Sequence, residues 1–246
     1  MAWLDLIFNT NTYVGILLIF SNFFSILLLY RYLGKTGLLI HIPISMLIAN
    51  LQVVKTVEIL GFVTALGNAM FGGSFFISDI LSEIYGKKSA KIAVFIGFYT
   101  LIALSVFMGL ALLFEPHSSD TSQEALEFIF TRTPRLMVAG LVSFVLSQFH
   151  DVWAYHFWKQ KMPELRFLFV RNNLSTLLSQ ILDTVLFTYL AFGLEFDFGF
   201  FHWEKLYPTE ILIEIAITAY ILKFFIAALD TPFLYFAVWM HKKYKL

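Results

Sequence analysis

The stretch RNNLSTLLSQILDTVLFTYLAF, Arg171–Phe192, decides the fold because it combines membrane-spanning length with a polar face. A helix needs about 20 mainly apolar residues to cross a bilayer, and this stretch supplies them. Asn173, Thr176, Gln180 and Asp183 recur at spacings of three and four, so they share one face of a helix. A carboxylate in hydrocarbon costs about 2.5–3.5 kcal/mol. Asp183 therefore points into a bundle, either as a functional residue or as a polar contact that only joins two helices.

The composition of the whole chain agrees with this interpretation. Of 246 residues, 59% are hydrophobic and 14% are charged, against about 25% charged in soluble domains. The formal net charge of zero offers no attraction for nucleic acid. The absence of cysteine excludes disulfides, thiolate metal sites and cysteine nucleophiles. We therefore expect an all-α integral membrane protein, and no removable signal peptide, because the N-terminus lacks a basic region and a cleavage site.

Seven apolar runs predict a polytopic bundle of seven transmembrane helices. The predicted spans are Thr12–Leu33, Leu38–Val54, Phe62–Leu81, Ile92–Phe114, Leu136–Trp158, Leu168–Phe192 and Glu210–Met240. The last span is long for a bilayer, so we expect it to tilt, protrude or kink near Thr231-Pro232. A short helix from Ser122 to Phe130 is predicted in the polar loop before the fifth span. Residues 1–246 thus form a single transmembrane domain.

The basic residues of the loops predict the orientation. With seven spans, twelve Lys and Arg fall on one side and four on the other, which places the first side in the cytoplasm and the N-terminus outside. The twelve are Arg31, Lys35, Lys87, Lys88, Lys91, Lys159, Lys161, Arg166, Arg171, Lys242, Lys243 and Lys245, and the four are Lys55, Arg132, Arg135 and Lys205.

Two matching motifs place polar side chains at membrane depth. The fifth span contains SQFHD (Ser147–Asp151) and the sixth SQILD (Ser179–Asp183), each with Gln and Asp three residues apart on one helix face. Because the two spans are consecutive and antiparallel, we expect the motifs at similar depths. Further buried polar candidates on the second, third and seventh spans are Asn50, Asp79, Lys223 and Asp230. Ionisable groups on four different helices exceed what helix association needs.

Several of these residues have simpler interpretations. Glu83 and Lys87 are expected to form a structural i,i+4 pair at the membrane interface. Lys223 could neutralise Asp183 or Asp151, or contact a substrate directly. Asp230 could satisfy backbone groups freed by Pro232. His150 and His156 lack a matching ligand set, so no metal site is predicted.

No enzyme motif is present, so we predict no catalytic residues and no cofactor. HExxH, GxSxG and GxxxxGK[ST] are absent, as are a channel filter and an Arg-rich voltage sensor. A secondary transporter or facilitator is therefore the leading interpretation, ahead of a membrane enzyme and a passive structural subunit.

Four sequence blocks together resemble the queuosine precursor transporter family, also called the vitamin uptake transporter family. They are SDILSEIYGKK (Ser78–Lys88), SQFHDVW (Ser147–Trp153), RNNLSTLLSQILDT (Arg171–Thr184) and ALDTPFLY (Ala228–Tyr235). The resemblance implies a family core at residues 37–240, with residues 1–36 as an extra span that six-span members lack.

The resemblance also implies a function and a location. The expected protein is a multi-pass importer in the bacterial cytoplasmic membrane, with the lipid bilayer and a small molecule as its partners. The small molecule is a 7-deazaguanine base, namely 7-cyano-7-deazaguanine, 7-aminomethyl-7-deazaguanine or queuine, salvaged for queuosine in tRNA. The alternatives are the substrate-binding subunit of an ATP-driven vitamin uptake system and an intramembrane enzyme. Whether the protein works as a homodimer stays open.

The polar residues fit the chemistry of such a base. A carboxylate can accept both donors of the guanine-like edge, and amides can serve the carbonyl and pyrrole N–H. We therefore expect Asp183 or Asp151 on that edge, Gln148 and Gln180 on the other polar atoms, and Lys223 balancing the charge. The full predicted set that lines the cavity is Asn50, Asp79, Gln148, Asp151, Gln180, Asp183 and Lys223.

Overall fold

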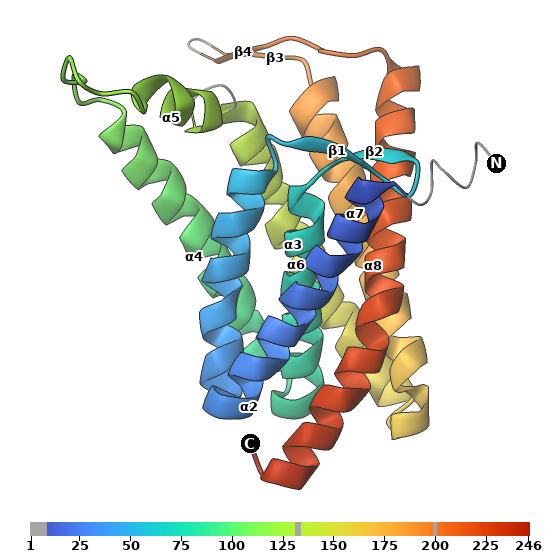
Figure 1. The fold of residues 1–246 in the computed structure, drawn as a ribbon. Helices are drawn as coiled ribbons and strands as arrows, with labels where there is room; N and C mark the ends of the chain where they lie inside the picture. The colour runs from blue at the N-terminus through green and yellow to red at the C-terminus, as the bar shows by residue number, and fades with distance from the viewer. Residues whose placement is uncertain (1–8, 131–133, 199–200) are drawn as a thin grey trace.

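The computed structural model describes residues 9–130, 134–198 and 201–246 and shows a bundle of helices running between two ends (Figure 1). One end, the hairpin end, carries two short antiparallel hairpins: β1 (Thr56–Ile59) with β2 (Phe62–Ala65), and β3 (Phe196–Phe198) with β4 (Phe201–Trp203). The other, the C-terminal end, contains the end of α8 (Thr209–Tyr244).

The first long helix, α2 (Thr10–Gln52), folds back on itself at Gly34. Gly34 has φ +55° and ψ −137°, a conformation open essentially only to glycine. His41 Nε2 lies 3.1 Å from Asn22 Oδ1, although 19 residues of straight helix would separate them by about 28 Å. Residues 10–33 and 35–52 are therefore two antiparallel legs, as Figure 1 shows, and they supply the first two predicted spans.

The predicted third span begins too early. Phe62–Ala65 is not helical but forms β2, paired with β1 across a turn in which Leu60 and Gly61 have φ +55° and +80°. Two consecutive residues with positive φ make the tight turn that matches the twist of a two-residue hairpin. The Leu60 N–H donates to Thr12 Oγ1 at 2.9 Å, which ties the hairpin to the start of α2. The third leg is α3 (Gly67–Ile80), continued by a π-helical turn, η1 (Leu81–Tyr85).

The remaining elements follow the predicted order. Chain direction reverses at Gly86, whose φ is +80°, and at the loops that follow. The elements are α4 (Lys87–Ala111), α5 (Gln123–Phe130), α6 (Pro134–Lys161), η2 (Leu165–Phe167), α7 (Leu168–Thr188), η3 (Tyr189–Gly193) and α8. The helix predicted at Ser122–Phe130 is confirmed as α5. Helix α8 continues through Pro232 without a break, and its 36 residues span about 54 Å.

Helix α3 lies at the centre of the bundle (Figure 1). All of its residues except Asn68 and Phe71 are buried, and it packs against α2, α4, α6 and α8. A Cβ on Gly72 would stand 2.5 Å from Ile226 of α8, and a Cβ on Gly73 would stand 2.5 Å from Asn22 of α2. These glycines therefore allow the close helix approach that membrane bundles use in place of a hydrophobic driving force.

Large apolar side chains cover the outside of the bundle, including Phe24, Phe95, Phe107 and Trp153, each more than half exposed. Within the described residues, four helical stretches are long and apolar enough to cross a membrane: Thr10–Gln52, Lys87–Ala111, Leu165–Gly193 and Thr209–Tyr244. With the two legs of α2, the central α3 and the polar α6, the described chain runs seven times between the two ends. The predicted all-α polytopic membrane bundle is confirmed.

Candidate functional site

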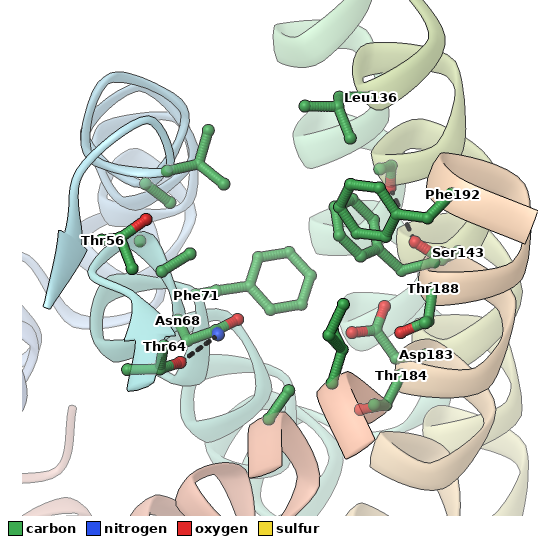
Figure 2. A pocket seen from close by; sticks show the side chains of 18 of the residues that line it. Thr56, Thr64, Asn68, Phe71, Leu136, Ser143, Asp183, Thr184, Thr188 and Phe192 are labelled. Carbon is green, nitrogen blue, oxygen red and sulfur yellow. Dashed lines mark hydrogen bonds between the residues drawn. The ribbon is translucent and has the colours of Figure 1, made fainter. Parts of the chain in front are cut away.

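A cavity of about 950 Å³ lies at the hairpin end of the bundle. Its lining comes from the second leg of α2, from β1 and β2, and from one end of each helix from α3 to α8. Figure 2 shows Thr64 and Asn68 on one side and Asp183, Thr188 and Phe192 on the other, with the Phe71 ring projecting between them. The cavity thus lies between α3 and α7, with the middle of the bundle as its floor.

An ion pair between α7 and α8 forms the charged part of this floor. Lys223 Nζ lies 2.5 Å from Asp183 Oδ2 and donates a second hydrogen bond to Thr184 Oγ1 at 3.2 Å. Ser147 of α6 donates to the other carboxylate oxygen, Asp183 Oδ1, at 3.2 Å. Asp183 is 3% exposed and Lys223 7%. A carboxylate and an ammonium group are therefore both present at the cavity surface, screened from bulk water.

Aromatic rings form much of the remaining surface. Phe71 projects into the cavity, and its ring centroid is 5.8 Å from Lys223 Nζ. Phe187, Phe192 and Tyr207 form an edge-to-face series, with centroids 6.1 Å and 5.8 Å apart. Rings held in fixed positions by such contacts offer flat apolar faces on which a planar ligand can stack.

Two amides line the wall of the cavity opposite α7. Asn68 donates to Thr64 Oγ1 at 3.0 Å, and Figure 2 shows its amide oxygen pointing into the cavity. Asn50 donates to the Met46 carbonyl of its own helix at 2.9 Å. These amides add hydrogen-bonding groups on the far side from the ion pair. In the sequence, Asn68 lies four residues before Gly72 on the same helix stripe as Asp79, but it was not among the predicted site residues.

Three of the predicted site residues, Asn50, Asp183 and Lys223, line this cavity. The other four lie deeper in the bundle, on the side of the floor that faces the C-terminal end. Each is at most 2% exposed: Asp79, Gln148, Asp151 and Gln180.

These deeper residues bond mainly to hydroxyl groups of neighbouring helices. Gln148 donates to Ser74 Oγ at 3.0 Å, Ser78 donates to Asp151 Oδ2 at 3.2 Å, and Thr176 donates to Asp79 Oδ2 at 3.2 Å.

The two matching motifs of α6 and α7 meet in a reciprocal arrangement. Ser147 donates to Asp183, while Ser179 lies within hydrogen-bonding reach of Asp151. The first residue of each motif therefore contacts the last residue of the other. His150 Nδ1 adds a 2.9 Å contact to Ser179 Oγ. The two motifs therefore lie beside each other on antiparallel helices, with their residues in reverse order.

A second polar cluster lies toward the C-terminal end, and we call Glu83, Tyr155, Lys159 and Arg171 the closing network. Arg171 is fully buried and donates to Glu83 Oε1 at 2.6 Å and to the carbonyls of residues 162, 163 and 164 at 2.9–3.2 Å. Tyr155 donates to Glu83 Oε2 at 2.8 Å, and Lys159 Nζ lies 3.2 Å from the same oxygen.

This network corrects the predicted pairing of Glu83. Glu83 pairs with Arg171 and Lys159 instead of Lys87. The i,i+4 spacing assumed a regular α-helix, but residues 81–85 form a π-helical turn and Gly86 ends it, so Lys87 starts the next helix. The role of Arg171 was also missed, because the sequence suggested a loop cation.

Asp230 also has a partner outside its own helix. The Asn172 amide donates to Asp230 Oδ1 at 2.9 Å and to Thr231 Oγ1 at 3.2 Å. Asp230 therefore bonds across to α7, beyond the local backbone role that its position before Pro232 suggested.

Comparison with known proteins identifies relatives of this chain. The family model described as "Putative vitamin uptake transporter" matches residues 65–237. A curated protein of Bacillus subtilis (strain 168), named "Probable queuosine precursor transporter", is 41% identical over 230 residues. That alignment covers 94% of this chain and 95% of the relative. No solved structure shows a significant match.

Proposed function

Because the chain belongs to the vitamin uptake transporter family and is therefore a membrane transport protein, we propose that it imports a queuosine precursor. The substrate would be a 7-deazaguanine base: 7-cyano-7-deazaguanine, 7-aminomethyl-7-deazaguanine or queuine. The name of the Bacillus subtilis relative supports this class. The observation that carries the proposal is the buried Asp183–Lys223 pair on the floor of an aromatic cavity.

The cavity suits a flat, polar, neutral ring. Its volume of about 950 Å³ falls at the upper end of small-molecule sites, which measure roughly 300–1,000 Å³. Stacking of a base on an aromatic side chain contributes about 1–3 kcal/mol. Phe71, Phe187 and Phe192 line the space in which that stacking would occur.

The ion pair matches the polar edge of the base. N1–H and the exocyclic amine are two adjacent donors, and a carboxylate accepts two adjacent donors. The neighbouring ring carbonyl is an acceptor, which the Lys223 ammonium can serve. The base would thus insert between Asp183 and Lys223 and replace their direct contact. Asn50 and Asn68, on the opposite wall, would hydrogen-bond the substituents of the five-membered ring.

We assign the deeper polar residues to the later part of the transport path. Asp79, Gln148, Asp151 and Gln180 lie between the cavity floor and the closing network, so the substrate would meet them after the floor opens. The structure then corresponds to a state open at the hairpin end and closed at the C-terminal end. By the distribution of basic residues, the hairpin end would face the outside of the cytoplasmic membrane.

The decisive experiment compares Asp183→Asn with the parent protein in ligand binding. The substitution turns one accepting oxygen into a donor that faces a donor of the base. Loss of a charged partner from a buried hydrogen-bonded edge costs about 2–5 kcal/mol, so affinity should fall about 30-fold or more. The ligands to titrate are guanine, the two precursors and queuine. Asp120→Asn, the same exchange in an exposed loop, is the matched control and should leave affinity unchanged.

A purely structural Asp183 would give a different result. The Asn variant would then be less stable, but its folded molecules would bind within threefold of the parent, and this outcome would disprove the assignment. Uptake by liposomes that contain this protein alone separates a self-sufficient carrier from a subunit of an ATP-driven system. Recovery of the base unchanged after incubation separates either of them from an intramembrane enzyme.

A further inference from the structure

Three carboxyl groups lie together between the cavity floor and the closing network. Asp79 of α3, Asp151 of α6 and Asp230 of α8 are each at most 1% exposed. Asp79 interacts electrostatically with both of the others, and Asp151 with Asp230. Their hydrogen-bond donors are neutral groups: Ser78 on Asp151, Thr176 on Asp79 and Asn172 on Asp230.

No cation of the described chain pairs with these three carboxyl groups. The nearest cations along the bundle pair with other acids: Lys223 with Asp183, and Arg171 and Lys159 with Glu83. An ionised carboxylate buried without a counter-charge loses several kcal/mol of solvation that nothing returns. The group must therefore carry protons or bind a cation.

The contacts of Asp79 and Asp151 leave room for a shared proton. The two carboxyl groups lie within hydrogen-bonding reach of each other, yet Oδ1 of each has no donor. Two nearby buried acceptors, Asn172 Oδ1 and Gln180 Oε1, also lack donors. The site thus has more buried hydrogen-bond acceptors than donors.

A proton fits this site better than a metal ion. One proton held between two carboxyl oxygens satisfies both of them, because carboxylates in such contact cannot both ionise. Among the described residues, no group of three or more His, Cys, Asp or Glu side chains is arranged to hold a metal ion.

We propose that the Asp79–Asp151 carboxyl pair is a proton-binding site that couples the inward movement of one proton to import of the substrate. This inference rests on the proposed transport function. The proton enters from the cavity, is shared by the two carboxyl groups while the C-terminal end is closed, and leaves when that end opens. One O–H bond forms and one breaks, and no other reactant is needed.

Hydroxyl groups offer a path for the proton through the packed interior. Ser175, Thr176 and Ser179 of α7 and Ser78 of α3 all lie within hydrogen-bonding reach of Asp151. Tyr155, at the other side of the pair, interacts electrostatically with Asp79 and donates to Glu83 of the closing network. The pair therefore stands between the floor of the cavity and the group that closes the opposite end.

Each element that packs around the pair carries further titratable or charged groups. These are His41 of α2, Glu83 of η1, the exposed Lys87, Lys88 and Lys91 at the start of α4, His150, Tyr155, His156 and Lys159 of α6, Arg171 and Asp183 of α7, and Lys223 and Asp230 of α8. Because any of these groups could make transport depend on pH, a pH dependence alone would not identify the pair. The test must therefore measure the coupling between proton movement and substrate transport.

The experiment uses purified full-length protein in liposomes with the membrane potential clamped at zero by potassium and valinomycin. Labelled 7-cyano-7-deazaguanine is the probe. An inside-alkaline gradient of one pH unit should drive accumulation to about tenfold for a one-to-one stoichiometry, since tenfold in a ratio corresponds to the free energy of one pH unit. A trapped pH dye should report acidification that depends on the base. Exchange of labelled for unlabelled base without a gradient measures transport itself.

In the variants Asp151→Asn and Asp79→Asn, accumulation and acidification should be lost relative to whatever exchange each variant still carries out. Asp120→Asn, in the exposed loop, should behave as the parent. The proposal is overturned if the parent exchanges the base but accumulates none, if a sodium gradient replaces the pH gradient, or if both Asn variants still accumulate. Absence of exchange in the parent would instead reject the proposed function.

A spectroscopic measurement covers variants that fail to fold. The protonated carboxyl of the pair should give an infrared carboxylic-acid C=O band in the parent that shifts in deuterium oxide. If the parent shows no such band, the shared proton is absent and the proposal fails, whatever the variants do.

Discussion

Glu83→Gln should shift the protein toward a state in which the C-terminal end of the bundle is open. Glu83 accepts from Arg171 at 2.6 Å and from Tyr155 at 2.8 Å, and it lies 3.2 Å from Lys159 Nζ. The substitution keeps the shape of the side chain and removes its charge. Arg171, whose side chain is fully buried, then loses its carboxylate partner.

The size of this shift follows from the burial of the Glu83–Arg171 ion pair. Removing one partner of a buried ion pair costs about 3–5 kcal/mol. The Glu83 side chain is 12% exposed, and Arg171 keeps three backbone carbonyls as acceptors, so we take the lower value. In a state open at the C-terminal end, water solvates these groups and the cost disappears. A difference of about 3 kcal/mol shifts the ratio of the two states about 150-fold toward the open one.

Single cysteines can report this shift, because the chain has none of its own. Ser82→Cys places a thiol next to Glu83 at a site with no exposure, and the Ser82 hydroxyl has no hydrogen bond to lose. Thr188→Cys places one in the cavity. In nanodiscs, a hydrophilic maleimide reaches both ends. Glu83→Gln should speed labelling at position 82 by up to about 150-fold and slow it at position 188.

Opposite changes in the labelling rate at positions 82 and 188 distinguish a conformational shift from loss of structure. An unchanged labelling rate at position 82 would refute the claim that the closing network holds this end shut. Faster labelling at both positions would mean that the variant unfolds, and would refute it equally.

Two further predictions concern topology and folding. A fluorescent reporter that matures only in the cytoplasm, fused after Leu246, should be bright, because the predicted topology puts twelve loop cations on the same side as the C-terminus; a dark fusion at normal expression contradicts the orientation. Gly34→Ala should lower stability by about 1–3 kcal/mol in thermal unfolding, since alanine is strained at φ +55° and ψ −137°. Gly109→Ala, with open space around its added Cβ, should raise stability by about 0.5–1 kcal/mol; equal effects would mean that the turn at Gly34 is not strained.

The bundle was predictable because apolar runs of spanning length dominate the sequence. The start of the third span was not predictable, because Thr56–Ala65 is rich in apolar and β-branched residues. Its hydrophobic pattern does not distinguish a helix from a strand. Gly61 was the one local signal for a hairpin turn. The fold-back at Gly34 was predictable only as a gap between two spans, since a glycine permits these backbone angles without requiring them.

The candidate site was predictable in its residues and less so in their depth. The motifs of α6 and α7 do face each other, but because the two helices are antiparallel, the residues of the two motifs follow one another in opposite directions along the bundle. Ser147 is level with Asp183, so Asp151 lies about 6 Å further along the bundle. Asp183 therefore reaches the cavity while Asp151 stays beneath its floor, a difference that spacing within each motif cannot show.

The reciprocal contacts between α6 and α7 also constrain how the molecule can move. One serine–aspartate contact would act as a pivot, about which two helices can rotate. Two such contacts, about one helical turn apart, oppose both rotation and sliding. Arg171 adds a third attachment by binding the carbonyls of the loop that joins the two helices. We therefore expect α6 and α7 to move as one unit, and a transport cycle that opens the two ends in turn to change the contacts of this unit with α3, α4 and α8.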